Sequence, residues 1–424
     1  MTSNVQADRS LSGDPATALH GPQTRERMHH DDVVVVGGGI GGLATALALR
    51  RSGRSVRVLE RAPAFTEVGA GIQLAPNATR ALDALGVLGD VIDVGVLPRR
   101  MVMADAVGGR ELTALDLTDF PQRYGGPYVV LHRSDLLGIL LKAGDEAGVS
   151  LETDAVVEGV VDDGDRVIAT CADGREFSAS VLIGADGLRS RLRPLFVRDD
   201  VVCSGYVAYR GAVPIEQVER HADLRDVVAW LGPGMHLVQY PLRSGDLYNQ
   251  VAVFRSPSFE RGDPDWGNPS ELTERFSVCC EHVRESVPML GTDHRWPMYD
   301  RVPTTKWTAG RIALTGDAAH PMLQYLAQGA CQAMEDTAVL ADLLVGRDLA
   351  DGGAVAAALT RFRDTRAPRT ARVQTAARVW GDIWHVDGVA KLMRDELMLD
   401  RDPDDHRHID WLYGAPPPAP PSAA

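Results

Sequence analysis

The start of the chain alternates short apolar runs with a helix-periodic segment. Residues 32–36 are an aspartate and four valines that stop at glycines, a pattern typical of a buried parallel strand. Leucines and alanines recur at helical spacing over 41–52, and 55–60 is the next apolar run. The pattern therefore predicts a strand–helix–strand unit at the beginning of the fold.

Two later regions differ from this start in their pattern. Further buried strands are expected at 126–132, 154–160, 166–171, 179–184 and 311–315. Between about 204 and 254, apolar and polar residues alternate in short runs, which indicates a mainly antiparallel sheet. Helices are expected at 330–345, 353–378 and 383–396. The fold class that follows is α/β: a Rossmann-like domain with an inserted, mainly antiparallel sheet domain and a C-terminal helical region.

Composition and charge narrow the class of protein. The 424 residues are 45% hydrophobic and carry a formal net charge of −14, with no basic patch of the kind that binds nucleic acid. No charge-free apolar stretch is long enough to span a membrane, and the first 30 residues lack the apolar centre of a signal peptide. We therefore expect a cytoplasmic protein with a disordered segment over 1–30 and a loose tail over 413–424.

The cysteines argue against metal and disulfide chemistry. Their number, five, is odd, and no two are spaced as C-x-x-C. Zinc sites, disulfide frameworks and the redox-active pair of flavoprotein disulfide reductases would each need cysteines that are paired at a suitable spacing. We therefore expect no metal site.

One glycine-rich segment has the pattern of a dinucleotide-binding turn. Gly37, Gly39 and Gly42 fit G-x-G-x-x-G between the first strand and the first helix, and Glu60 ends the second strand. The three glycines permit, in this order, a tight turn, close approach of the backbone to a pyrophosphate, and close packing of helix on strand. The helix N-terminus faces the phosphate charge, and Glu60 can accept hydrogen bonds from an adenosine ribose. The alternative is a glycine-rich turn that binds nothing.

Two later segments each place an aspartate at the end of an apolar strand. They are Gly184-Ala185-Asp186-Gly187 and Gly316-Asp317-Ala318-Ala319-His320-Pro321. Such an aspartate suits a contact with a ribose or ribityl hydroxyl. By pattern alone, each segment is equally well explained as a simple turn.

Together and in this order, the three segments resemble those of the single-component FAD-dependent aromatic hydroxylases, over about residues 32–400. The resemblance implies a tightly bound, non-covalent FAD, NADH or NADPH as a transient reductant without a second Rossmann domain, and O2 as co-substrate. It also allows a homodimer. The residues that it assigns to the cofactor are Gly37, Gly39, Gly42, Glu60, Arg61, Gln73, Arg133, Asp186, Gly187, Asp317, Gly329 and Ala330.

Within this set, the resemblance gives individual roles. The first motif would bind the ADP part of FAD, and Asp186 with Gly187 would serve both FAD and the passing nicotinamide. Asp317 would contact the ribityl chain, and Arg133 would approach the pyrophosphate or ribityl region unless it forms only a surface salt bridge. The corresponding division gives the FAD-binding domain 31–105, 131–200 and 298–345, the substrate domain 106–130 and 201–297, and the C-terminal helical region 346–412.

The candidate catalytic residues are His236, Tyr240 and Gln324. His236, Val238 and Tyr240 share one face of a predicted strand, because side chains alternate along a strand. The alternatives are a satisfied sheet histidine and a core tyrosine. The resemblance places Gln324 at the edge of the flavin ring and Gly329 at a helix N-terminus whose amides stabilise charge on the flavin.

This set resembles the 3-hydroxybenzoate 6-hydroxylases, which implies conversion of 3-hydroxybenzoate to 2,5-dihydroxybenzoate (gentisate) through a flavin C4a-hydroperoxide. A phenol has a pKa of about 10 and a histidine of about 6.5, so His236 can pull on the phenolic proton and activate the ring. A decarboxylating salicylate 1-hydroxylase is the alternative, and a non-oxygenating FAD reductase is a further one. The sequence names no group for the substrate carboxylate. Tyr206 and Arg210 lie on a predicted strand near the pocket, and a purely structural role is the alternative for both.

Overall fold

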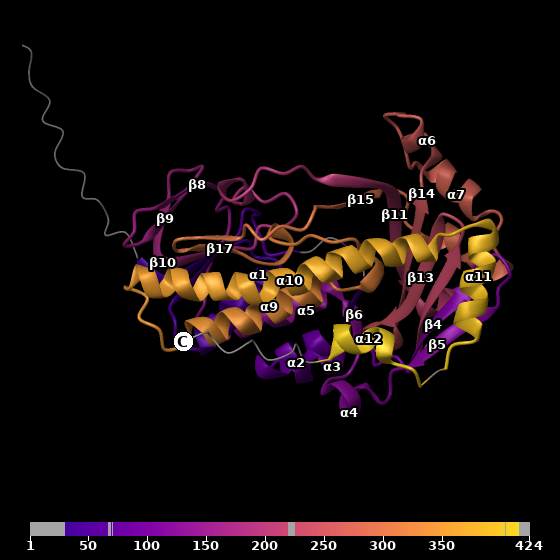
Figure 1. Ribbon diagram of the computed structural model, residues 1–424, viewed down its shortest axis with the longest axis horizontal. Coiled ribbons are helices and arrows are strands. Elements are labelled where there is room, and N and C mark those ends of the chain that lie inside the picture. The colour runs from indigo at the N-terminus through magenta and orange to yellow at the C-terminus, as the bar shows by residue number, and fades with distance from the viewer. Residues whose placement is uncertain (1–29, 67–68, 70, 219–224, 403, 415–424) are drawn as a thin grey trace, which may run out of the picture.

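The computed structural model describes residues 30–66, 69, 71–218, 225–402 and 404–414. Two β-sheets lie at opposite ends of an elongated molecule, and a long helix, α10 (Gly352–Trp384), runs beside both of them (Figure 1). The expectations for residues 1–29 and 415–424 fall outside the described residues.

An eight-stranded sheet forms one end of the molecule. Its order is β16-β17-β10-β1-β2-β7, and β9 and β8 extend it from β10. The pairs from β17 through β10, β1 and β2 to β7 are all parallel, as expected for a Rossmann-like domain. The strands are β1 (His30–Val36), β2 (Val56–Leu59), β7 (Ser150–Glu152), β8 (Val157–Asp162), β9 (Val167–Cys171), β10 (Glu176–Gly184), β16 (Thr308–Ala309) and β17 (Ile312–Leu314).

The predicted strand–helix–strand start is confirmed. The valines of β1 are buried, and α1 (Ile40–Arg51) follows the glycine turn directly. Three parallel strands then end at one edge, because Val36 pairs with Gly184 and Gly184 pairs with Leu314. The three motif segments that follow these strands therefore meet in space.

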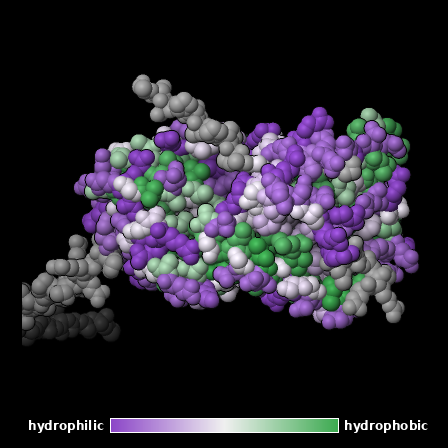
Figure 2. All heavy atoms as spheres, turned by 90° about the horizontal axis from the view of Figure 1, so that it is seen from below, coloured by the Kyte–Doolittle hydropathy of each residue, from purple (hydrophilic) through white to green (hydrophobic). Residues whose placement is uncertain are grey.

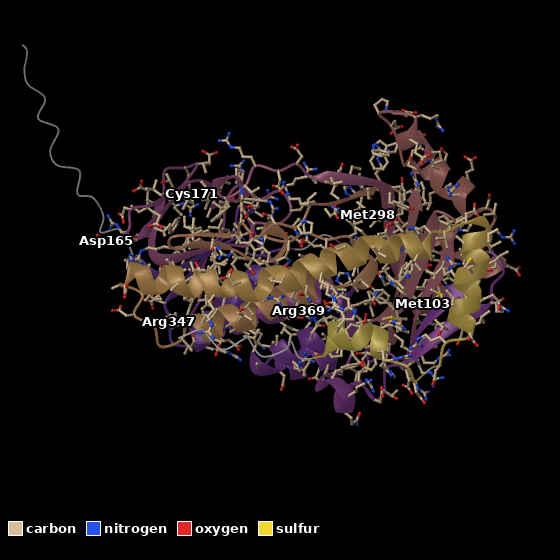
Figure 3. The ribbon with its side chains drawn as sticks, viewed as in Figure 1. Met103, Asp165, Cys171, Met298, Arg347 and Arg369 are labelled. Atoms are coloured by element: carbon tan, nitrogen blue, oxygen red, sulfur yellow. The ribbon has the colours of Figure 1, made fainter. Side chains whose placement is uncertain are left out.

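A seven-stranded sheet forms the other end, in the order β15-β11-β14-β13-β12-β4-β5. Its strands are β4 (Arg100–Asp105), β5 (Glu111–Asp116), β11 (Val202–Pro214), β12 (Asp226–Gly232), β13 (Met235–Leu242), β14 (Leu247–Arg255) and β15 (Trp296–Asp300). Met103 of β4 and Met298 of β15, labelled in Figure 3, lie toward opposite edges of this sheet. The strands β3 (Gly71–Leu74) and β6 (Val129–His132) pair with each other in a separate two-stranded sheet.

Two of the expected domain boundaries differ from the strand pairing. Residues 100–105, expected in the FAD-binding part, form β4 and pair with β12 in the seven-stranded sheet. The expected boundary after residue 297 falls inside β15, which pairs with β11. Alternating apolar and polar residues predict that a strand has one buried face. They do not predict which sheet the strand joins, because β12 and β11, with which β4 and β15 pair, are far away in the sequence.

The expected C-terminal helices are present, but the break between the last two lies later in the chain than expected. Instead of ending at 378, α10 continues to Trp384, and α11 is Gly388–Leu399. Gly381 lies within this helix, and only glycine fits there because an added Cβ would lie 2.4 Å from the Tyr325 ring. The other helices are α2 (Pro76–Ala84), α3 (Leu88–Val94), α4 (Phe120–Tyr124), α5 (Arg133–Ala147), α6 (Pro257–Glu260), α7 (Pro269–Phe276), α8 (Glu281–Ser286), α9 (Gly329–Leu344) and α12 (Arg407–Tyr413).

The surface is mixed in polarity. Figure 2 shows apolar residues gathered in patches between hydrophilic ones on the face seen from below. Among the described residues, no helix combines the length and the apolar composition needed to cross a bilayer. Nor do three or more histidine, cysteine or acidic side chains gather in a metal-binding group within this part of the chain.

Candidate active site

The glycine turn is packed too tightly for any side chain. Gly37 has a φ of +111°, and a Cβ on it would lie 2.3 Å from the carbonyl oxygen of Ala185. A Cβ on Gly42 would lie 1.9 Å from the carbonyl oxygen of Gly37. The turn, the start of α1 and the second motif segment are therefore in backbone contact, which is the geometry that a bound pyrophosphate requires.

A small cavity of about 210 Å³ opens beside this turn. Glu60 is fixed at its rim, where its two carboxylate oxygens accept from the N–H groups of Gly38 (2.7 Å) and Ala62 (2.8 Å). One carboxylate oxygen of Asp186 accepts from the Arg191 N–H (2.7 Å), and the other is buried without a partner among the described residues. A buried acceptor left open at a cavity fits a ribose hydroxyl. The residues of this cavity that the sequence predicts are Gly37, Gly39, Glu60, Arg61, Asp186 and Gly187.

A much larger cavity, of about 1530 Å³, runs from the start of α1 to the seven-stranded sheet. It exceeds the range of about 300–1,000 Å³ typical of pockets for one small molecule, so it has room for a dinucleotide and an aromatic substrate together. The predicted residues that line it are Gly39, Gln73, Arg133, Gly187, His236, Tyr240, Asp317, Gln324, Gly329 and Ala330. The structure thus brings both catalytic and cofactor candidates to one space.

A buried charge network holds the third motif segment in place. Asp336 of α9 accepts from the Thr315 hydroxyl (2.9 Å), the Gly316 N–H (3.0 Å) and the Arg366 guanidinium (2.7 Å). The imidazole of His320 lies 2.6 Å from the same carboxylate. Burial alone would raise the pKa of Asp336, but His320 and Arg366 outweigh it and lower that pKa. This fixes the turn that presents Asp317.

Asp317 itself lines the large cavity next to the start of α9. Burial raises the pKa of its carboxyl, and His320 and Arg133 partly offset this rise. The N-terminus of α9 begins at Gly329, whose first backbone N–H groups have no partner within the helix. A carboxyl that faces the cavity and free helix N–H groups together suit a polyhydroxyl chain and an electron-rich ring edge of FAD.

Arg369 joins the C-terminal segment to this network. Its guanidinium donates to Glu335 (2.6 Å) and to the backbone oxygens of Trp411 and Leu412 (both 2.8 Å). Figure 3 shows Arg369 on α10 in the middle of the molecule, between the two large sheets. The end of the described chain is therefore attached beside the cavity.

The strand β13 forms one wall of the cavity. His236, Val238 and Tyr240 all line it, as expected from their common face. Burial raises the pKa of Tyr240, and the neighbouring Arg210, Arg133 and Gln73 partly offset this rise. Gln73 in turn accepts from the Tyr128 hydroxyl at 2.7 Å. Tyr128 was not predicted from the sequence, because it precedes a short apolar strand and has no local signal of its own.

His236 has a hydrogen-bond partner that was also not predicted from the sequence. Its Nδ1 lies 2.8 Å from Nε2 of His385, the residue after the last turn of α10. Tyr206 stacks on His385 with ring centroids 4.6 Å apart. Burial, followed by the neighbouring His385, lowers the pKa of His236, and burial lowers that of His385 to about 3. Both imidazoles are therefore neutral at neutral pH.

Arg210 is a partly buried cation on the same cavity wall. Its Nη2 donates to Gln324 Oε1 (3.0 Å), while its Nε is buried without a partner in the described part of the chain. No carboxylate forms an ion pair with it there, and burial, then Arg133, lower its pKa. Side chains alternate along β11, so residues 206, 208 and 210 share one face. This alternation is the sequence signal that places the Arg210 side chain on the cavity face.

Comparisons with known proteins agree with this geometry. A family model described as FAD binding domain matches residues 30–377. The 3-hydroxybenzoate 6-hydroxylase of Polaromonas naphthalenivorans is 40% identical, over 90% of this chain and 95% of its own. The 3-amino-4-hydroxybenzoate 2-monooxygenase of Streptomyces cremeus is 38% identical, over 90% of this chain and 94% of its own. A crystal structure of HpxO from Klebsiella pneumoniae with FAD and uric acid has a TM-score of 0.79 at 26% identity, covering 90% of this chain and 95% of that one.

Proposed function

This chain belongs to the FAD-binding family of aromatic hydroxylases and is an FAD-dependent monooxygenase, and on that premise we propose that it converts 3-hydroxybenzoate to gentisate with NAD(P)H and O2. When bound, FAD would supply the activation of O2 at the cavity. The glycine turn, Glu60 and Asp186 would hold its ADP part, and Asp317 with Gly329 would hold the ribityl chain and ring edge.

The observation that carries this proposal is a cation and a histidine on one sheet face, where the cation, Arg210, has no ion-pair partner in the described part of the chain. Arg210 pairs across to Val251, and Val251 pairs to Val238. His236 lies two residues from Val238 on the same face. An apolar floor of two valines therefore separates a positive charge from a proton acceptor. Such a floor suits a benzene ring with a carboxylate at one side and a hydroxyl at another.

The polar groups on this wall have distinct roles. His236 would accept the phenolic proton at Nε2, which makes the ring more nucleophilic. Tyr240 has a raised pKa and stays protonated, so it can donate a hydrogen bond to substrate. Gln324 would orient the Arg210 guanidinium through their 3.0 Å hydrogen bond.

Product analysis tests the substrate assignment. The holoprotein is incubated with NADH and, separately, with 3-hydroxybenzoate, salicylate, 4-hydroxybenzoate, 3-amino-4-hydroxybenzoate and 6-hydroxynicotinate, and products are separated by HPLC. We expect gentisate from 3-hydroxybenzoate as the main product of the panel. Catechol from salicylate as the main product would instead support the decarboxylating alternative.

Replacing Arg210 with methionine should remove the preference for an acid. A charged hydrogen bond contributes about 1.5–3 kcal/mol, so kcat/KM for 3-hydroxybenzoate should fall by about 10- to 150-fold. The same constant for the uncharged 3-hydroxybenzyl alcohol should change little. The R210K variant keeps the charge but loses the planar fork of donors. Its kcat/KM for 3-hydroxybenzoate should therefore lie between those of wild type and R210M. An equal loss for both substrates in R210M would mean that Arg210 does not hold the carboxylate.

A further inference from the structure

The floor under the proposed substrate continues across the sheet beyond the two valines. Val238 pairs with Ala229 of β12, and Ala229 pairs with Met103 of β4. Met103 in turn pairs with Thr113 of β5, and all four residues line the large cavity. Neighbouring strands lie about 4.8 Å apart, so this row reaches about 14 Å past Val238, further than one benzene ring covers. We call the part of the cavity over Ala229, Met103 and Thr113 the extension.

The extension is bounded by helices as well as by the sheet. Met103, labelled in Figure 3, lies on β4 beside α11, and the ion pair between Lys391 and Asp105 (3.1 Å) ties α11 to this strand. None of the residues assigned to FAD lies on β12, β4 or β5. An apolar group of the substrate therefore suits the extension better than the cofactor does. The apolar side chains of the two helices that line the cavity are Trp380 and Ile383 of α10 and Ala390, Met393, Leu397 and Met398 of α11.

The two ends of the extension differ. At its far end, the Thr113 hydroxyl accepts from Arg401 (3.4 Å), which also donates to the backbone oxygen of Ala114 (3.1 Å). The apolar part therefore runs only from Val238 to Met103, which is two strand spacings or about 10 Å. About six carbons, joined by bonds of about 1.5 Å, cover this length.

The extension also reaches the surface of the protein. Met393 and Leu397 of α11 line the cavity and are 62% and 72% exposed. An apolar chain that lay against them would remove part of this surface from water. The rim thus favours a ligand with an apolar substituent over one without it.

Arg210 determines which ring position faces the extension. It lies in the same row as Val251, Val238 and Ala229. A ring whose C1 carboxylate binds Arg210 therefore points the opposite carbon, C4, along the row toward Ala229. The C3 hydroxyl and the reacting carbon C6 stay free. A substituent at C4 would enter the extension without displacing either of them.

We propose that this protein also hydroxylates 3-hydroxybenzoates that carry an unbranched alkyl chain of about six carbons at C4, and that Ala229 and Met103 determine this specificity. The inference rests on the proposed function, because it uses the same site and the same reaction. The hydrogen on C6 is replaced by a hydroxyl group whose oxygen comes from O2. NAD(P)H supplies two electrons and, with one proton, the second oxygen atom leaves as water. 4-Hexyl-3-hydroxybenzoate thus gives 4-hexyl-2,5-dihydroxybenzoate.

A series of substrates tests this specificity in the wild type. The FAD-loaded enzyme is incubated with NADH and with 3-hydroxybenzoate or its 4-methyl, 4-propyl and 4-hexyl derivatives, and products are identified by HPLC and mass spectrometry. Each fully buried methylene should strengthen binding about fourfold, which is about 0.8 kcal/mol. Because the rim leaves the chain partly exposed, we expect kcat/KM to rise by about tenfold or more from the parent to the 4-hexyl compound.

An isomer separates the extension from general apolar attraction. 2-Hexyl-3-hydroxybenzoate has the same composition, but its chain lies between the carboxylate and the hydroxyl and points away from Ala229. It should be hydroxylated at least about tenfold less efficiently than the 4-hexyl compound.

Two substitutions test the residues of the extension. Ala229→Leu fills the space next to the ring and should lower the ratio of kcat/KM for the 4-hexyl compound to that for the parent by about tenfold or more. Met103→Gln needs no additional room at this half-buried position, and its amide beside the chain should lower the same ratio by about fivefold or more. Ala212→Leu is the matched control on β11, outside the cavity lining, and should keep the wild-type ratio.

The outcomes separate this inference from the proposed function. If 3-hydroxybenzoate itself gives no gentisate, the proposed function fails. If it gives gentisate but the 4-hexyl compound is not hydroxylated, or yields only hydrogen peroxide, the inference is wrong and the proposed function stands. The inference is equally wrong if A229L and M103Q both keep the wild-type ratio, because the chain then lies elsewhere.

Discussion

Replacing His236 with alanine is expected to lower the rate of gentisate formation by about 100- to 10,000-fold, the range of a lost general base. The protein should still bind FAD, because His236 lies on β13 and none of the cradle segments depends on it. NADH oxidation should continue in part, with most of the oxygen appearing as hydrogen peroxide, because the unactivated ring no longer competes for oxygen. Gentisate, NADH and peroxide are measured in the same samples.

Leu237→Met is the matched control for this substitution. Leu237 is the next residue on β13, fully buried in a separate apolar cluster on the opposite face of the sheet. A change of similar volume there should cost less than about 1.5 kcal/mol of stability and leave coupling unchanged. An H236A variant that makes gentisate at the wild-type rate would remove His236 from the chemistry.

Replacing Gly42 with alanine is expected to abolish the yellow colour of the purified protein. The new Cβ would lie 1.9 Å from the Gly37 carbonyl oxygen, a backbone atom that can move only by opening the turn. Overpacking costs about 1–3 kcal/mol, and a clash with backbone belongs at the upper end, so FAD binding should weaken by about 100-fold or more. FAD titration by fluorescence quenching gives the dissociation constant.

Gly138→Ala is the matched control for the cradle. Gly138 lies in α5, which packs against α1, and nothing lies within 4 Å of a Cβ added there. Alanine in a helix interior is favoured over glycine by about 1 kcal/mol, so this variant should bind FAD normally and melt no earlier than wild type. A G42A protein that binds FAD as tightly as G138A would show that the turn does not cradle the pyrophosphate.

Much of the fold follows from local sequence pattern. Apolar runs predicted β1, β10 and β17, because a buried parallel strand needs little beyond a continuous apolar stretch. The meeting of the three motif segments also follows, since parallel strands end at one edge. The position of β4 was not predictable in this way. Its partner β5 is close in the sequence, but β12, which joins both strands to the seven-stranded sheet, lies more than 120 residues after β4.

The residues that the sequence missed act through distant contacts. His385 and His236 are 149 positions apart, and no pattern near Trp384 indicates that the end of α10 reaches β13. Arg210 could be placed on the cavity face by alternation, but only the folded chain shows that no carboxylate among the described residues forms an ion pair with it. Tyr128 is recognisable only from its contact with Gln73. Long-range polar contacts therefore required the structure.

Turnover under ¹⁸O2 tests whether this chain hydroxylates an aromatic ring with bound flavin and molecular oxygen. The FAD-loaded enzyme, NADH and 3-hydroxybenzoate are incubated under labelled oxygen, and the product is analysed by mass spectrometry. The account predicts gentisate that carries a single ¹⁸O atom and no product when oxygen is removed. Unlabelled product, or turnover of NADH and substrate that continues without oxygen, would contradict it.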